Sequence, residues 1–171
     1  MANTLTKEIR YTALWGGNLA RTTGSTGRWL GIPTGHQNTI FNGGTSSNPD
    51  ADYSLATTAD DLCSVIWQPL SSIVVKKCKI FYGQGGTTNT THKLILMRYD
   101  IDADGDLDNG VDTGEVKSFL NSDDSSHMRG GNLTITTDNA VTSSQVLIAF
   151  VNCVDDVNTA MGAKCIIEYT M

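Results

Sequence analysis

Five aspartates stand at alternate positions in one short stretch of the sequence, around a single glycine. They are Asp100, Asp102, Asp104, Asp106 and Asp108, and the glycine is Gly105. Alternating carboxylates suit a hard cation such as Ca²⁺, because their oxygens can converge while the glycine permits a sharp turn. This spacing matches the first half of an EF-hand-type calcium loop that begins at Asp100. The chemistry first suggested by the sequence is therefore cation binding.

The second half of the calcium pattern is missing. Val111 occupies the position where a bidentate Glu is expected, and the preceding segment KLILMRY has the composition of a strand, not a helix. A cation would still offset the repulsion among the carboxylates, with further ligands from Asp112, Glu115, a carbonyl or water. We expect a weak, structural Ca²⁺ that orders one loop on a β scaffold. A solvated acidic turn is the alternative.

Catalytic patterns are not evident elsewhere. The chain contains neither a G-x-x-x-x-G-K-[ST] phosphate loop nor a G-x-S-x-G nucleophile motif. His36, His92 and His127 lie in different segments without neighbouring metal ligands, and each is interpreted as a surface histidine. The sequence therefore favours a protein that is not an enzyme.

The four cysteines allow two interpretations. Cys63, Cys78, Cys153 and Cys165 each lie in an apolar, strand-like run, which favours buried free thiols. Cys63 and Cys78 are also symmetric about PLSS, and Cys153 and Cys165 about NTA. If both segments were hairpin turns, each pair would lie nearly opposite across two strands. The sequence does not decide whether either pair forms a disulfide.

Composition indicates strands and turns. The 171 residues are 39% hydrophobic and only 18% charged, and threonine and glycine are abundant. β-Branched residues favour sheets, whereas glycine disfavours helices. A net charge of −6 argues against nucleic-acid binding, which needs a basic face. Lys77 and Lys79 are expected on one face of a strand and Lys76 on the other, at a solvated edge.

The elements that must position the acidic loop are short strands separated by turns. No run reaches the length of a membrane span, and no signal peptide is visible, so folding in a cytoplasm is expected. These features predict an all-β antiparallel sandwich or barrel over residues 51–171. The expected strands cover residues 62–70, 72–83, 92–100, 115–120, 132–137, 145–154 and 164–171.

Residues 1–50 differ from the rest. They are rich in Gly, Thr and Asn, and their apolar residues occur singly, which predicts an extended N-terminal arm. Isolated apolar side chains in such an arm could anchor on a neighbouring subunit. The candidates for partner binding are Trp15, Trp29, Leu30 and Phe41. The alternative is that these residues pack onto their own domain.

Three stretches carry a resemblance that extends along the whole chain. They read RYTALWGGNLARTTGSTGRWLGIPTG, ADDLCSVIWQPLSSIVVKKCKIFYGQGGTTNTTHK and AFVNCVDDVNTAMGAKCIIEYTM. The sequence resembles virion structural proteins of tailed phages, especially those of marine cyanobacterial myoviruses. The resemblance implies a jelly-roll-like β-sandwich that works in copies, commonly trimers, on a bacteriophage particle. It implies other virion proteins, such as the major capsid protein, as partners, and it transfers no catalytic residues.

The leading hypothesis is a capsid decoration (cement) protein, assembled in the host cytoplasm and located in the virion, with neither nucleic acid nor membrane as partner. A fibre or tail appendage is the second hypothesis. A third is a carbohydrate- or host-receptor-binding β-sandwich, in which Trp15, Trp29 and Trp67 would offer stacking faces.

Overall fold

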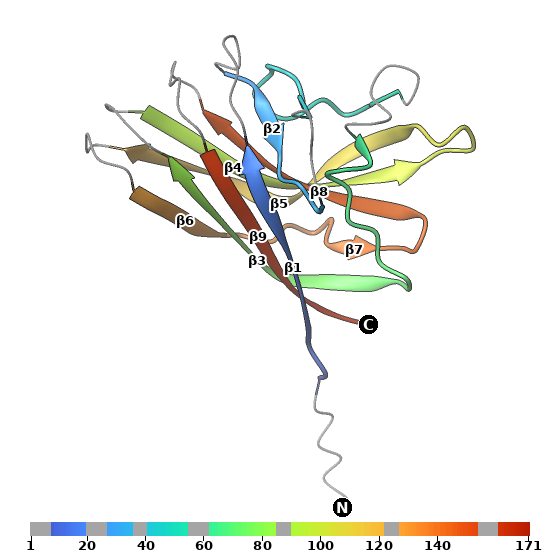
Figure 1. Ribbon diagram of the computed structural model, residues 1–171. Helices are drawn as coiled ribbons and strands as arrows, with labels where there is room; N and C mark the ends of the chain where they lie inside the picture. Colours follow the sequence, from blue (N-terminus) through green and yellow to red (C-terminus); the bar gives the residue numbers. More distant parts are fainter. Residues whose placement is uncertain are drawn as a thin grey trace, which may run out of the picture.

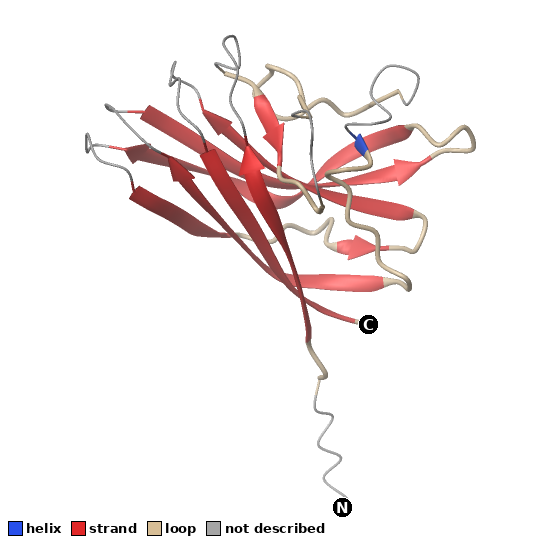
Figure 2. Cartoon of the chain, in the orientation of Figure 1, coloured by secondary structure: helices blue, strands red, loops and turns tan. Residues whose placement is uncertain are grey.

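The chain forms two antiparallel sheets packed face to face (Figure 1). The computed structural model describes residues 8–19, 27–35, 41–54, 62–84, 90–121, 127–153 and 161–171. Almost all regular structure there is strand (Figure 2). The strands are β1 (Tyr11–Leu19), β2 (Trp29–Gly31), β3 (Ile73–Gln84), β4 (Thr90–Ile101), β5 (Leu107–Asn121), β6 (His127–Leu133), β7 (Ala140–Val141), β8 (Gln145–Cys153) and β9 (Met161–Thr170).

The strand order is that of a jelly roll. Sheet A has the order β1-β9-β3-β6, with β7 on β3, and sheet B has the order β2-β8-β4-β5. The antiparallel pairs β1–β9, β2–β8, β3–β6 and β4–β5 are nested, as in one long hairpin rolled into two sheets. Nested pairing across two sheets defines the jelly-roll topology. The predicted jelly-roll-like sandwich is thereby confirmed.

The main core lies between the sheets and follows the period of the strands. Along β3, Val75, Cys78, Ile80 and Tyr82 are buried, whereas the residues between them are more exposed. Alternation of this kind arises because successive side chains point to opposite faces of a sheet. One face of sheet A is therefore in the core, and its outer face meets solvent.

Sheet B is buried on both faces. Leu94 and Leu96 of β4 point into the main core, whereas Ile95 and Met97 belong to a second cluster that includes Phe41. Segments 41–54 and 62–67 contribute this cluster's remaining members outside the strands. Burial on both faces explains why β4 and β8 read as continuous apolar runs. Within the described part of the chain, the outer face of sheet A is thus the sheet face that is left open.

The predicted N-terminal arm is not an arm over its described part. Residues 11–19 form β1, paired with β9 along its whole length, and residues 29–31 form β2 in sheet B. The prediction was wrong because it took the glycines as a sign of an extended arm, whereas the glycines of β1 allow close packing. A Cβ on Gly16 would lie 2.4 Å from the Ala163 carbonyl oxygen, and one on Gly17 would lie 2.8 Å from the ring of Pro33.

Three further predicted strands differ from the structure. The run over residues 132–137 holds only the end of β6 and an isolated bridge from Ile135 to Gly114. The run over residues 62–70 forms a turn, closed by the Val65 amide donating to the Leu62 carbonyl, and then a single bridge from Trp67 to Leu147. Its apolar residues cover sheet B instead of extending it. The segment over residues 115–120 is the far end of β5, which is longer than the sequence pattern suggested.

Candidate functional site

The acidic stretch forms the tip of the β4–β5 hairpin, at the right of Figure 1, and we call it the acidic hairpin (residues 100–108). Asp100 lies opposite Asp108, and Ile101 opposite Leu107, so residues 102–106 make the turn. Asp102 Oδ1 accepts hydrogen bonds from the backbone amides of Asp104 (2.9 Å) and Asp106 (2.8 Å). Gly105 has φ 87°, which glycine adopts readily. The tip is therefore closed by its own hydrogen bonds.

The carboxylates of Asp100 and Asp102 are engaged within the fold. Asp100 accepts hydrogen bonds from Asn109 Nδ2 (3.1 Å) and Gln145 Nε2 (2.6 Å), while Asp102 closes the turn. Among the described residues, no three His, Cys, Asp or Glu side chains converge as metal ligands would. The fold thus brings the predicted ligands to one hairpin without bringing their carboxylates together. Weak Ca²⁺ binding stays a prediction.

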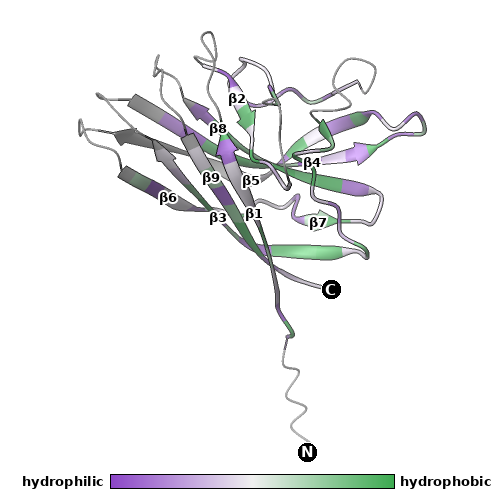
Figure 3. Ribbon diagram, viewed as in Figure 1, coloured by the Kyte–Doolittle hydropathy of each residue, from purple (hydrophilic) through white to green (hydrophobic). Residues whose placement is uncertain are grey.

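The surroundings of Asp108 change the pKa of its carboxyl group. Partial desolvation raises the pKa of this carboxyl, and the charges of Asp102, Asp52 and Asp106 raise it further. Its charged form is therefore disfavoured in the folded chain. The hairpin is a strongly acidic projection, and its tip is hydrophilic (Figure 3).

The four predicted partner-binding residues are buried within their own chain, which corrects that prediction. Trp29 is fully buried and donates from Nε1 to the Ser46 carbonyl at 3.0 Å. Phe41 is 1% exposed and meets Tyr53 edge-on, with ring centroids 4.9 Å apart. Trp15 and Leu30 are also buried, in the main core. Their isolation in the sequence reflects the short strands and loops that deliver them to the core.

The cysteines are arranged differently from either suggested pairing. Cys63 is exposed in the turn after Leu62, whereas Cys78 and Cys165 are both buried, with their sulfur atoms 3.8 Å apart across β3 and β9. Burial, followed by the contact with Cys78, raises the pKa of the Cys165 thiol well above its usual value. The Cys153 side chain lies outside the described part. The structure supports the prediction of buried free thiols for Cys78 and Cys165.

His92 corrects another expectation. It is fully buried next to the ring of Tyr82, with ring centroids 4.6 Å apart. The sequence predicts a surface histidine here, but His92 lies on the same face of β4 as Leu94 and Leu96, which points into the main core. His36 and the side chain of His127 lie outside the described part.

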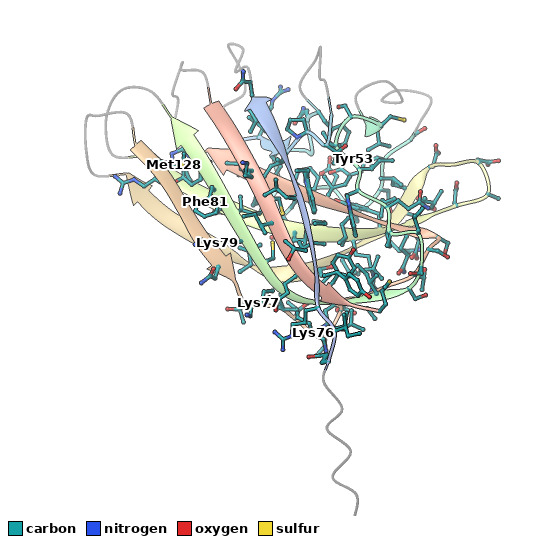
Figure 4. The ribbon with its side chains drawn as sticks, turned by 60° about the horizontal axis from the view of Figure 1, so that its bottom comes forward. Tyr53, Lys76, Lys77, Lys79, Phe81 and Met128 are labelled. Atoms are coloured by element: carbon teal, nitrogen blue, oxygen red, sulfur yellow. The ribbon has the colours of Figure 1, made fainter. Side chains whose placement is uncertain are left out.

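The outer face of sheet A carries a concentration of basic side chains that the sequence analysis did not identify as a site. Five basic residues gather on it, and in Figure 4 the lysines of β3 follow one line along the strand. They are Arg10, Lys76, Lys77, Lys79 and Lys164. Lys76 shares this face with Lys77, against the prediction, because a β-bulge interrupts the alternation between Val75 and Lys77. Positive charge thus gathers on one face of a chain whose net charge is −6.

Two carboxylates neutralise part of this face. Glu8 pairs with Lys76 (3.1 Å) and with Arg10 (3.1 Å), and Glu168 pairs with Arg10 (2.5 Å). Lys77 lies 3.4 Å from Glu168. The hydrogen bond from Lys76 lowers the pKa of Glu8, and the one from Arg10 lowers that of Glu168. Lys79 and Lys164 have no carboxylate partner among the described residues, so the face keeps an excess of positive charge.

A hollow of about 550 Å³ lies on this face, next to Lys164. Its floor is glycine backbone, because Gly16, Gly83 and Gly162 occupy neighbouring strands, and its apolar walls include Phe81 and Met128. The ring of Phe81 also receives the Lys79 ammonium at 4.6 Å. We call this feature the glycine hollow. The sequence shows each glycine, but only the strand register shows that they meet.

Comparison with known proteins adds little to this geometry. No family model and no curated protein matches the chain. A solved structure with detectable likeness is the cryo-EM structure of Broad Bean Stain Virus. That match is 6% identical, covers 100% of this chain and 89% of the viral chain, and has a TM-score of 0.29. A score this low supports no argument, so the fold assignment rests on the strand order.

No helix among the described residues has the length and apolar character needed to cross a membrane.

Proposed function

We propose that the chain is a non-enzymatic structural protein of a bacteriophage virion, whose copies associate with one another and dock on the particle. A capsid decoration protein that works as a trimer is the specific form we favour, with the major capsid protein as the other partner. The resemblance of the sequence to virion proteins of tailed phages motivates the proposal. The jelly roll agrees with it, since this topology is common in viral capsid domains, although a fold by itself does not define a function.

The observation that carries the proposal is a gathering of exposed apolar side chains at one end of sheet A. Tyr11 begins β1 and stacks on Tyr169, two residues before the exposed Met171. Ser71 contacts the Met171 sulfur, which places its neighbour Leu70, fully exposed, at the same end. Ile9 is 67% exposed. Exposed apolar residues that gather in one place mark association surfaces more often than scattered ones do.

This end also differs from a catalytic site. Apolar side chains dominate it, and the nearby charges of Glu8, Arg10 and Glu168 are engaged in ion pairs with one another. Such groups hold a surface together and offer no free acid, base or nucleophile at that place. A docking role is therefore the chemistry that this end supports best.

The carbohydrate-binding alternative is less well supported. Its stacking faces were to be Trp15, Trp29 and Trp67, but the first two are buried, and Trp67 stacks on Trp15 with ring centroids 5.8 Å apart. Tryptophans engaged in the core do not form the exposed aromatic platform that a sugar ring would need. A fibre or tail appendage remains the second candidate, because the jelly roll suits both locations.

Co-sedimentation with phage particles tests the proposal. The purified chain, added to heads that lack it, should pellet with them and raise the temperature at which they release DNA. Leu70→Ser with Met171→Ser should weaken this binding while leaving the unfolding temperature of the chain unchanged. Thr45→Ser, at an exposed position in the segment that covers sheet B, is the matched control. Failure of the chain to bind heads and tails alike would overturn the virion assignment.

A further inference from the structure

The glycine hollow is open space that the fold does not require. A Cβ at Gly83 would meet no atom within 4 Å, and one at Gly162 would find its nearest neighbours at 3.8 Å. By contrast, Gly130 is needed locally, since its Cβ would lie 2.7 Å from Phe81, whose ring covers it. Side chains at Gly83 and Gly162 would fit the strands, yet none is present. Packing therefore explains the glycine at position 16, where β9 comes close, but not the empty floor at Gly83 and Gly162.

The charge around the hollow selects an acidic occupant. Lys164 lines the hollow, opposite Phe81 of β3. Lys79 lies two residues before Phe81 on the same strand, opposite Ile166 of β9. Both ammonium groups lack a carboxylate partner among the described residues, as noted above. Apart from Lys164 and Asn18, the lining consists of apolar side chains, Tyr82 and glycine backbone. A narrow, negatively charged projection with small side chains would complement this surface in both shape and charge.

The chain itself presents such a projection. The acidic hairpin ends in the exposed residues Asp102, Ala103 and Asp104, where an alanine stands between two carboxylates. The hollow lies on sheet A near the end of β3, whereas the hairpin follows the far end of β4 in sheet B, so one chain cannot bring its own hairpin to its own hollow. We propose that the glycine hollow of one copy receives the acidic hairpin of a second copy. This inference rests on the proposed function, because it names the surfaces through which copies would associate.

The contact can repeat in two ways. Two copies can exchange hairpins reciprocally in a twofold dimer, or they can join head to tail, in which case each bound copy still offers one free hairpin and one free hollow. Repetition closes a ring if the rotation between copies permits, and a trimer is the smallest such ring. Because the complementarity is ionic and partly exposed, association should weaken as salt rises from about 50 to about 500 mM.

Filling the hollow is the first test. Gly83→Leu places a side chain where no atom lies within 4 Å of the Cβ, so the monomer should keep or slightly gain thermal stability. Sedimentation velocity over a dilution series should show association weakened about tenfold or more, because the occupant loses its space. Gly35→Leu is the matched control, since its Cβ also meets nothing within 4 Å but lies off sheet A. Equal association of both variants would overturn the proposal.

A charge exchange identifies the partner as a second copy. Lys79→Glu with Lys164→Glu makes the hollow acidic, and Asp104→Lys with Asp108→Lys makes the tip basic. Each double variant alone should lose association by about tenfold or more, because like charges then meet. An equimolar mixture should recover it, since the unaltered hollow accepts the unaltered tip and the altered pair also match. No recovery in the mixture would exclude the hairpin as occupant.

The outcome for phage particles separates this inference from the proposed function. Variants that bind heads but associate normally with themselves would overturn the hollow–hairpin contact and leave the virion role intact. Binding of the hollow to another virion protein, with the unaltered chain monomeric at every concentration, would also overturn it. Loss of self-association in the variants, with recovery in the mixture, supports it even if no particle is bound.

Discussion

Replacement of Phe41 by alanine tests whether the apolar residues of the N-terminal region belong to the core. Phe41 is 1% exposed, packs edge-on against Tyr53, and lies 6.2 Å from the ring of Phe150. It also covers the backbone of Gly31, where a Cβ would lie 3.0 Å from its ring. All of these neighbours are fixed by strands or by backbone hydrogen bonds. The surroundings can therefore collapse only partly into the space left by the ring.

The expected cost follows from that rigidity. Truncation of a buried phenylalanine to alanine lowers the free energy of unfolding by about 3–5 kcal/mol. For a chain of this length, 1 kcal/mol corresponds to about 2–4 °C, so the melting temperature should fall by about 6–20 °C. Phe41→Leu keeps most of the volume and should cost about 1.5 kcal/mol or less. Leu70→Ala, at a fully exposed site, should change the free energy by about 0.5 kcal/mol or less.

The assay is urea unfolding followed by tryptophan fluorescence and circular dichroism, with the native mass measured in parallel. The Phe41→Ala midpoint should fall with an unchanged slope, because the same surface is exposed on unfolding. An anchor on a neighbouring subunit would give the opposite result, with the stability of the monomer preserved and association lost. That outcome would refute the placement of Phe41 in the core.

Other predictions follow from the charges, the thiols and the strand glycines. Asp108→Asn should raise the melting temperature at neutral pH, because the raised pKa of this carboxyl means that folding disfavours its charged form. The gain should vanish below the ordinary aspartate pKa of about 4, where the unfolded carboxyl is also protonated. If the acidic hairpin binds Ca²⁺, millimolar Ca²⁺ should raise the melting temperature of the unaltered chain more than that of the double variant Asp104→Asn with Asp108→Asn. Equal melting temperatures of the unaltered chain in Ca²⁺ and in chelator would reject the site. In native protein, iodoacetamide should label Cys63 rapidly and leave Cys78 and Cys165 unlabelled, as peptide mapping can show; fast labelling of Cys165 would contradict its burial. Gly16→Val should destabilise the fold strongly, since its Cβ meets backbone at 2.4 Å, whereas Gly162→Val should be tolerated, and thermal melts of the two would reveal any reversal.

The acidic hairpin shows what a local sequence motif can predict and what it cannot. The spacing of its aspartates predicted a turn around Gly105, and the structure has that turn. Whether the carboxylates converge depends on their partners, and Gln145 reaches Asp100 from a strand 45 positions away. Asp102 is used by the turn itself. A local pattern specifies which oxygens are available, whereas long-range hydrogen bonds decide where they point.

The sequence by itself determined the fold class, because the alternation along β3 and the apolar runs of β4 and β8 follow from the two faces of a sheet. It also favoured buried thiols at Cys78 and Cys165, through their apolar surroundings, but left their pairing to the structure. The sequence did not determine the structure of the N-terminal region. Gly16 and Gly17 suggest a flexible segment until their packing against β9 and Pro33 is known.

Only the tertiary structure decided which faces stay open. Segments 41–54 and 62–67 cover sheet B and leave sheet A exposed, and no periodicity within those segments states which sheet they will cover. A single bulge moved Lys76 onto the same face as Lys77, and strand register placed Gly83 opposite Gly162, with Gly16 beside Lys164 two positions along the strands. These features depend on pairings between residues far apart in the chain. The glycine hollow and its basic border are therefore properties of the assembled sandwich.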